Sequence, residues 1–267
     1  MKKIVVILSV LAALVSITAC NKKVEAGEFT VEKGKLKIGM EIGYPPMEYY
    51  DADGKTPIGF DVELGKALAA RYGLEAEFID TAWDGIFAGL ETKKYDCIIA
   101  AVTITPERKE TMEFSAPYVG NGQAIVVKAD SGFNPASPAD LTGKIVAYQA
   151  ETTSDIFMTK QAEAGLKFTP AEFDKVINAF DELKFGRCDA VVCDALVFAN
   201  YADDPAFVST WVGKADEFFG VAIRKGNSAL VEKINSAISQ MREDGSMKEL
   251  YEKIFGTDLS ETTKENL

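Results

Sequence analysis

Apolar segments with strand-like periodicity alternate with amphipathic helical segments along most of this 267-residue chain, and this alternation constrains the fold more than any other feature. In the first half, strands expected at 36–39, 74–79 and 97–99 are separated by helices that begin near Gly59 and at Trp83. A strand–helix–strand order places the strands parallel in one sheet, with the helices on its faces. This half is therefore expected to form a βαβαβ unit.

A second βαβαβ pattern follows, so the fold class that we expect is α/β with two βαβαβ lobes. A new strand at 124–127 and a polar loop lead into this second unit. Its remaining elements are expected as a strand at 144–148, a helix that starts after Gln149, a helix at 172–185, a strand at 189–194 and a strand at 218–223.

The chain ends in two amphipathic helices, expected at 229–243 and 247–254. So little chain remains after them that they must pack on an existing lobe, and we assign them to the first, reached by a second crossover near 216–220. The expected boundaries are 35–119 and 219–258 for lobe 1, 120–218 for lobe 2, and 259–267 for a polar tail.

The N-terminus has the features of an export signal. Lys2 and Lys3 precede an apolar run at 4–17, which is shorter than the roughly 20 residues that a membrane-spanning helix needs. Small residues then lead into Cys20, which resembles a bacterial lipoprotein signal. On that resemblance, 1–19 is a removed signal peptide, Cys20 carries acyl chains such as palmitate, and 20–34 is a lipidated tether. The alternative is an ordinary secretory signal that happens to contain Cys20.

Charge and composition exclude several classes of function. The chain has 41 acidic and 29 basic residues, and nucleic-acid binding requires a basic face instead. It has no histidine, which removes Ser–His and Cys–His nucleophile pairs and the commonest zinc ligand. No metal and no cofactor is therefore expected.

Three cysteines remain beyond Cys20, an odd number for an exported chain. Cys188 and Cys193 flank one expected strand on opposite faces, which is a poor arrangement for a disulfide. A disulfide from Cys97 to either would join two lobes. We therefore interpret all three as small buried apolar residues.

Thr105-Pro106 has the composition of a helix start, with Thr as N-cap and Pro at the first helical position. Arg108 then lies at about the third helical position, where a cation opposes the helix dipole. An anion is expected nearby, and a guanidinium pairs well with a carboxylate. The alternative is that Glu107 or Glu110 neutralises Arg108 on a solvated face.

Several polar side chains follow the ends of the first-lobe strands. In parallel sheets, ligands bind beyond the carboxyl ends of the strands. Each of these side chains could instead be structural, and Trp83 could belong to the core. The candidates in lobe 1 are Glu41, Tyr44, Trp83, Thr103 and Arg108.

Lobe 2 offers two further candidate positions. The turn at Thr152-Thr153 leads into a helix, whose free backbone N–H groups can bind an anion. Asp194 ends a strand, where a carboxylate suits an ammonium group. The alternatives are an ordinary Thr cap and an ordinary Asp N-cap.

Taken together, these residues resemble the extracellular solute-binding proteins of polar amino-acid ABC transporters, over nearly the whole mature chain. The order of the motifs carries the resemblance more than any single one of them. The motifs are Gly59-Phe60-Asp61-Val62-Glu63-Leu64, Trp83-Asp84-Gly85, Thr103-Ile104-Thr105-Pro106-Glu107-Arg108, Phe114-Ser115-Ala116-Pro117-Tyr118, Gln149-x-x-Thr152-Thr153 and Gly186-Arg187-Cys188-Asp189-Ala190.

The resemblance implies the type II periplasmic binding protein fold, in which two hinge strands join two lobes that close on an amino acid. Arg108, with Thr152, Thr153 and the turn amides, would hold the α-carboxylate. The α-ammonium would meet Thr103, the carbonyl of Ala101 and, from the other lobe, Asp194. The side-chain pocket would be lined by Glu41, Tyr44 and Trp83.

The chain departs from the family pattern at a few positions. Glu151 stands where the family usually has glycine, which is costly if the turn requires a positive φ and otherwise adds a negative charge beside the pocket. Met47 replaces a usual aromatic residue. Ala100 and Ala101 replace residues that often carry hydroxyls, so only their backbone groups can contribute.

Glu41 beside Tyr44 and Trp83 favours a cationic ligand, arginine or lysine first and cystine next. The expected partners are an ABC permease and, through lipid on Cys20, the membrane, with a monomer in the periplasm or on the outer face of the cell membrane. Two alternatives stay open: a periplasmic dehydratase-like enzyme on the same scaffold, and a ligand-sensing partner of a membrane receptor. The pairing of Arg108 with Asp194 favours binding, so no enzyme activity is expected.

Overall fold

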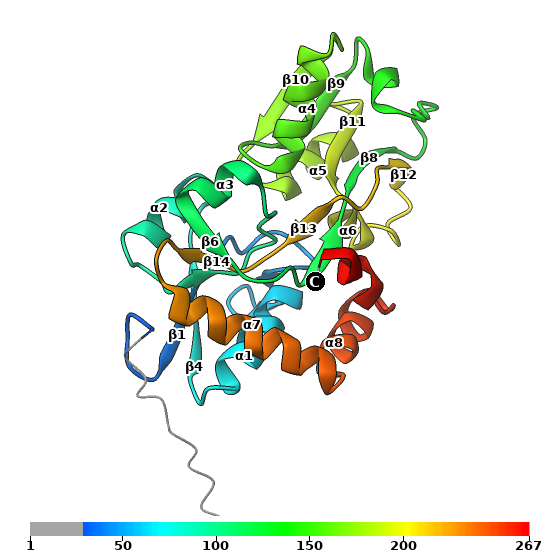
Figure 1. The fold of residues 1–267 in the computed structure, drawn as a ribbon. Coiled ribbons are helices and arrows are strands. Elements are labelled where there is room, and N and C mark those ends of the chain that lie inside the picture. The colour runs from blue at the N-terminus through cyan, green and yellow to red at the C-terminus, as the bar shows by residue number, and fades with distance from the viewer. Residues whose placement is uncertain (1–28, 267) are drawn as a thin grey trace, which may run out of the picture.

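A computed structural model describes residues 29–266, and these form two lobes that each contain a five-stranded sheet (Figure 1). The predicted signal peptide and Cys20 lie outside the described residues. No helix in the part of the chain that is described has the length and hydropathy that crossing a bilayer requires.

Lobe 1 is built on a sheet with the strand order β4-β1-β5-β14-β6. Strand β1 pairs in parallel with β4 and β5, as the strand–helix alternation predicts, whereas β14 returns antiparallel to β5 and β6. The elements of this lobe are β1 (Lys35–Met40), β2 (Tyr49–Tyr50), β3 (Pro57–Ile58), α1 (Phe60–Ala70), β4 (Glu75–Asp80), α2 (Trp83–Glu91), β5 (Cys97–Ile98), α3 (Pro106–Thr111), β6 (Met112–Phe114), β14 (Ala222–Arg224), α7 (Ser228–Glu243) and α8 (Ser246–Phe255).

Lobe 2 has the strand order β10-β9-β11-β8-β12. Strand β9 pairs in parallel with β10 and β11, and β8 is antiparallel to β11 and β12. Its elements are β8 (Gln123–Lys128), η1 (Pro138–Leu141), β9 (Ile145–Gln149), α4 (Thr153–Glu163), β10 (Thr169–Phe173), α5 (Val176–Lys184), β11 (Ala190–Asp194), α6 (Ala195–Ala199) and β12 (Phe207–Val212).

Two short strands, β7 (Val119–Asn121) and β13 (Glu217–Phe219), join the lobes as an antiparallel pair. The predicted fold, two α/β lobes joined by two hinge strands, is thereby confirmed. The single strand expected at 218–223 is wrong, because the chain leaves the hinge pair at Gly220 and joins the lobe 1 sheet as β14. A Cβ at Gly220 would lie 2.7 Å from the Ile104 side chain, so the crossing is tightly packed.

The helix expected at 172–185 is wrong at its N-terminal end. Residues Thr169–Phe173 form the edge strand β10, in which Glu172 pairs with Tyr148 of β9, and the helix α5 begins only at Val176. Pro170 and the polar residues of β10 mask its strand character, and proline is tolerated there because β10 lies at the sheet edge. Pairing with β9 therefore determines a structure that the local composition does not indicate.

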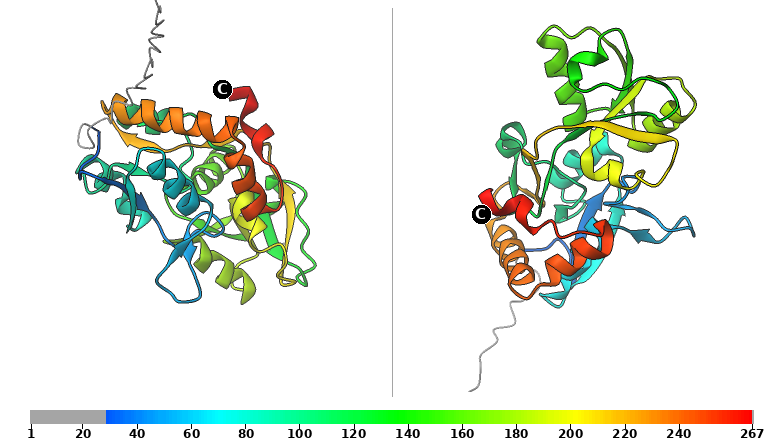
Figure 2. Two further views of the ribbon diagram at one scale, coloured as in Figure 1. Left: turned by 90° about the horizontal axis from the view of Figure 1, so that it is seen from below. Right: turned by 90° about the vertical axis from the view of Figure 1, so that its right-hand side faces the viewer.

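The two C-terminal helices pack on lobe 1. Helix α7 contacts α1 and β6, and α8 contacts α1. Both views of Figure 2 place these helices, in orange and red, on the lobe that contains the blue and cyan N-terminal elements. The ring of Phe60 on α1 stacks against Tyr251 of α8, with ring centroids 5.4 Å apart, and this fixes the C-terminal end of the chain to the lobe 1 core.

Both ends of the described chain are more closely packed than the sequence suggested. The predicted tether reached residue 34, yet Phe29 is buried against Tyr72 and the Val31 amide donates to the Asp96 carboxylate. The predicted polar tail contains η2 (Ser260–Asn266), in which Thr263 is fully buried. Neither segment is therefore a free extension, because each supplies groups that complete hydrogen bonds on lobe 1 or the hinge.

Cys97, Cys188 and Cys193 are buried and unpaired, which agrees with their interpretation as small apolar residues. The loop at 51–55 forms a turn, since the Asp53 carboxylate accepts hydrogen bonds from the Lys55 and Thr56 amides.

Candidate functional site

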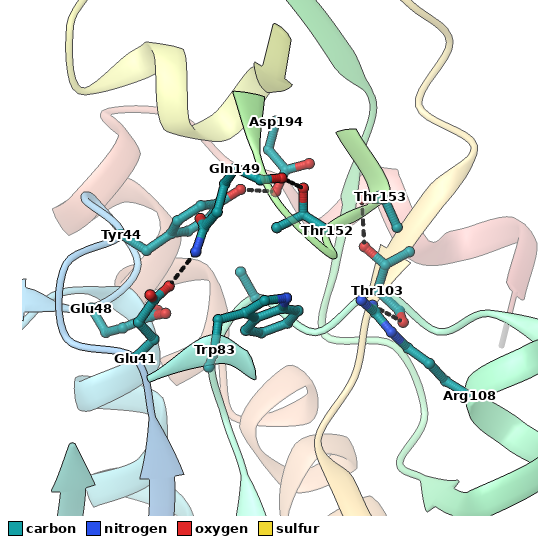
Figure 3. Close-up of a pocket in the computed structure, with 12 residues that line it drawn as sticks. Glu41, Tyr44, Glu48, Trp83, Thr103, Arg108, Gln149, Thr152, Thr153 and Asp194 are labelled. Carbon is teal, nitrogen blue, oxygen red and sulfur yellow. Dashed lines mark hydrogen bonds between the residues drawn. The ribbon is translucent and has the colours of Figure 1, made fainter. Parts of the chain in front are cut away.

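A pocket lies between the two lobes, and every ligand-binding residue predicted from the sequence lines it (Figure 3). The lining also includes Glu48, which the sequence reasoning missed. The lining residues are Glu41, Tyr44, Glu48, Trp83, Ala100, Ala101, Thr103, Arg108, Gln149, Thr152, Thr153 and Asp194.

The start of α3 positions Arg108 as predicted. Pro106 is the first helical residue, and the Thr105 hydroxyl oxygen accepts a hydrogen bond from the Arg108 amide at 3.1 Å. The guanidinium donates to the Thr103 carbonyl at 2.9 Å, and its carbon lies 5.4 Å from the Trp83 ring centroid. Burial lowers the pKa of Arg108. Its charge is therefore held in a desolvated position beside an aromatic face.

The alternative environment for Arg108, a solvated ion pair, is wrong. Within residues 29–266, neither Glu107 nor Glu110 forms a salt bridge with the guanidinium, which lines the pocket instead. Trp83 is not purely a core residue either. Its indole N–H donates to the Glu151 carbonyl at 3.1 Å, across the interface between the lobes.

Asp194 is the most strongly held acid of the pocket. Its carboxylate accepts hydrogen bonds from Tyr44 Oη at 2.5 Å, Asn121 Nδ2 at 2.7 Å and Gln123 Nε2 at 3.1 Å. Asp194 occupies the N-cap position of α6, as the alternative expected, but its side chain makes no capping bond to that helix. Burial raises the pKa of Asp194 to about 7, and the negative charge of Glu217 adds to that effect.

The N-terminus of α4 has no side-chain cap. Thr152 occupies the N-cap position, but its hydroxyl donates to the Gln149 carbonyl at 2.8 Å and does not accept from the first turn. The alternative of an ordinary Thr cap is therefore wrong. The Thr153 hydroxyl lies 3.5 Å from that of Thr103 on the other lobe. The first-turn amides of α4 form an end of positive potential that faces the pocket.

The opposite end of the pocket is acidic. Figure 3 shows Glu41 and Glu48 on one side of the Trp83 ring and Arg108 on the other. Glu41 Oε2 accepts from Gln149 Nε2 at 2.7 Å, while Glu41 Oε1 and Glu48 Oε2 have no hydrogen-bond partner within the described chain. Burial raises the pKa of both carboxyls, so a cation placed between them would favour their ionised forms.

Buried Asp61 shapes the loop that precedes Thr103. Its carboxylate accepts from the Ala101 amide at 2.6 Å and from Tyr118 Oη at 3.0 Å, and burial raises its pKa to about 7. Ala101 is held at φ 47°, in the left-handed region. Met47 is fully buried in the core and does not line the pocket.

Glu151 has φ 60°, so the turn does require the conformation that favours glycine. Its side chain is exposed, and its amide donates to the Asp155 carboxylate at 2.9 Å. The cost of having Glu151 in place of glycine therefore lies in the backbone conformation, because a residue other than glycine is held at a positive φ.

Four hydrogen-bonded contacts join the lobes directly around the pocket, so the lobes are closed over it. They are Tyr44 with Asp194, Gln149 with Glu41, Trp83 with the Glu151 carbonyl, and Thr103 with Thr153.

Comparison with known proteins agrees with this geometry. The family model for bacterial extracellular solute-binding proteins, family 3, matches residues 36–257. The L-cystine-binding protein TcyJ of Escherichia coli (strain K12) is 35% identical over 232 residues, which cover 86% of this chain and 85% of that protein. ABC transporter arginine-binding protein 1 of the same strain is 31% identical over 227 residues, covering 83% of this chain and 90% of that protein.

Solved structures give the same result. A structure of an ancestral arginine-binding protein bound to arginine has 40% sequence identity and a TM-score of 0.79, covering 84% of this chain and 99% of that one. The family match spans both sheets, the hinge strands and every pocket residue named above. This chain therefore belongs to the bacterial extracellular solute-binding proteins, family 3.

Proposed function

We propose that this protein binds a polar amino acid between its lobes and delivers it to the permease of an ABC transporter. The observation that carries the proposal is the charge arrangement of one closed pocket. A desolvated guanidinium and an uncapped helix N-terminus face one side of it, and buried carboxylates face the others. An amino acid zwitterion has the complementary pair of fixed charges.

The main-chain groups of the ligand would use both lobes. Arg108, the α4 amides beginning with those of Thr152 and Thr153, and the Thr153 hydroxyl suit the α-carboxylate, because charge-assisted bonds to a carboxylate are the stronger class. Asp194, the Thr103 hydroxyl and the Ala101 carbonyl suit the α-ammonium. Because each lobe supplies partners for the ligand, binding stabilises the closed form selectively, which is the requirement for a ligand to shift the equilibrium.

The side chain of the ligand would extend toward Glu41 and Glu48. Their unpartnered, buried oxygens favour a cationic group, and the Trp83 and Tyr44 rings offer faces on which a guanidinium can stack. We therefore infer arginine or lysine as the preferred ligand and cystine as the next. Relatives named for arginine and for cystine binding support the same range.

Calorimetry with the twenty amino acids and cystine tests this proposal. We expect arginine or lysine to bind most tightly, and Glu41→Gln to weaken arginine binding by tenfold or more, since a buried charge pair is lost. The matched control is Glu151→Gln, which removes an exposed carboxylate at the rim and should leave affinity unchanged. Tight glutamate binding with none for arginine, lysine or cystine would overturn the ligand assignment.

We also propose that the protein is a monomer held on the outer face of the membrane by lipid on Cys20. Cys20→Ser should abolish incorporation of labelled palmitate and release the protein from the membrane fraction, whereas Cys97→Ser should change neither. Retention of the label in the Cys20 variant would contradict the anchor. The dehydratase-like alternative is less supported, because the relatives carry binding names, and we propose no catalysis.

A further inference from the structure

Glu217, which the sequence reasoning did not select, bonds to both lobes at once. It is the first residue of the hinge strand β13 and is partly buried. Its carboxylate accepts from Thr103 Oγ1 of lobe 1 at 3.2 Å and from Gln123 Nε2 of lobe 2 at 2.7 Å. The carboxylate therefore bridges the two bodies that must move relative to each other, from the strand about which they move.

The contacts of Gln123 extend this bridge to the ammonium side of the pocket. Its amide nitrogen also donates to Asp194 Oδ1 at 3.1 Å, while its amide oxygen accepts from the Ser154 hydroxyl at 2.7 Å. The Ser154 bond fixes which end of the amide faces the acids. Glu217 and Asp194 thus share one donor group.

No lysine or arginine forms a salt bridge with Glu217 in the described chain, so its charge is not neutralised by a direct ion pair. Its nearest functional neighbours are instead the groups proposed to bind the amino acid. The charge of Glu217 acts on Arg108 and on Asp194. A solvated polar residue with no role in the site would not be expected to bond to both Thr103 and Gln123.

We propose that Glu217 is a positioning residue for ammonium recognition, which orients Thr103 and Gln123 from the hinge strand and controls Asp194. The proposal rests on the proposed function in taking Asp194 as the partner of the ammonium. It assigns the hinge a chemical role in the site, in addition to its mechanical one.

Asp194 is surrounded by several groups that influence its charge. Burial is the largest influence on its raised pKa, and the charge of Glu217 follows. Removing that charge should lower the pH at which Asp194 ionises. The titratable and charged groups that face Asp194 from the elements around it are Tyr44, Glu48, Arg108, Cys193 and Glu217.

The first experiment needs no ligand. The Asp194 carboxyl carbon is followed by ¹³C NMR against pH in the wild type, Glu217→Gln, Glu217→Asp and Asp216→Asn, with the signal assigned by its loss in Asp194→Asn. We expect Glu217→Gln to lower the Asp194 midpoint by roughly one pH unit. Glu217→Asp keeps the charge and should stay near the wild-type midpoint. Asp216→Asn removes the exposed neighbouring charge and should not move it. An unchanged midpoint in Glu217→Gln overturns the proposal.

The second experiment measures arginine affinity against pH. Glu217→Gln should shift the acidic limb of binding to lower pH by the same amount, with an unliganded melting temperature within a few degrees of the wild type. A purely structural role would weaken binding equally at every pH and would overturn the proposal. If the wild type binds no amino acid, the proposed function fails, while the ligand-free titration still decides the role of Glu217.

Discussion

Each lobe leads from a β-strand into a helix at the pocket, and the two junctions differ in how the helix begins. At α3 in lobe 1, the Thr105 side chain caps the helix by accepting from the Arg108 amide. At α4 in lobe 2, the Thr152 side chain bonds back to the Gln149 carbonyl and leaves the first turn uncapped. The capped junction presents a side-chain cation, and the uncapped junction presents backbone N–H groups.

Under the proposed function, the same βα topology would recognise an anion in two ways. A capped helix end has satisfied its own donors, so it must use a side chain to hold a ligand. An uncapped end keeps its donors and its positive potential available. Under the proposed function, the two lobes would contribute different chemistry to one carboxylate, and each contribution can be tested separately.

Removing the side-chain cation should have the largest effect. Arg108→Ala should weaken arginine binding by about 2–5 kcal/mol, because the partner charge would be left without its guanidinium in a desolvated site. Isothermal calorimetry measures the loss. Lys109→Ala, which changes an exposed residue of the same helix, is the control. If Arg108→Ala bound arginine normally, the backbone donors of α4 would suffice to hold the ligand carboxylate. The α3 junction would then have no role in binding it.

A change of pH should have the second-largest effect on arginine affinity. Under the proposed function, ligand binding needs ionised Asp194, whose pKa is raised to about 7, so affinity should fall by up to about tenfold for each unit below pH 7. The pKa of Asp61 in lobe 1 is likewise raised to about 7, but this carboxyl supports the Ala101 loop and does not line the pocket.

The stability of the unliganded protein should change with pH in the direction opposite to the affinity, so it should fall as the pH rises. A carboxyl whose pKa is raised by folding binds its proton more tightly in the folded chain, so it destabilises the fold as pH rises from about 4 to 7. Asp61→Asn and Asp194→Asn should each flatten the fall in stability over that range, as seen in urea unfolding at several pH values. Only Asp194→Asn should also abolish arginine binding. If Asp61→Asn abolished it as well, the two buried acids would not have separate roles.

Capping the uncapped junction should have a moderate effect. Thr152→Asn introduces a preferred cap whose oxygen competes with the ligand for the α4 amides, so arginine affinity should fall about tenfold while the α4 end is stabilised by about 0.5–1 kcal/mol. Thr105→Ala makes the reverse change on α3 and should cost about 1 kcal/mol of stability. Calorimetry and thermal unfolding of both variants measure these changes. Tighter binding in Thr152→Asn would show that the α4 donors do not face the ligand.

The smallest expected effect concerns the turn before α4. Glu151→Gly relieves a left-handed backbone at φ 60° and should stabilise the protein by up to about 1 kcal/mol, with no change in affinity. Thermal unfolding with and without arginine measures both quantities. A lower melting temperature would mean that the Glu151 side chain has a structural role.

Sequence patterns predicted much of the fold and of the candidate site. The βαβαβ order, the Thr105-Pro106 helix start and the clustering of Arg108 near Thr103 all follow from local periodicity, capping preferences and short spacings, which the chain specifies over a few neighbouring residues. Glu41 follows β1 and Asp194 ends β11, and both line the pocket, which agrees with the rule that ligands bind beyond the carboxyl ends of the strands. The binding roles of these residues and the domain boundaries stay predictions until they are tested.

Only the tertiary structure determined the rest. The edge strand β10 forms because β9 offers it a partner, and the hinge strand separates from β14 because Gly220 allows close packing. Glu48 and Glu217 have no local signal, since their environment is made by residues distant in the sequence. The physical reason is that periodicity and capping act between neighbours, whereas burial, desolvation and shared hydrogen bonds exist only after the two lobes meet.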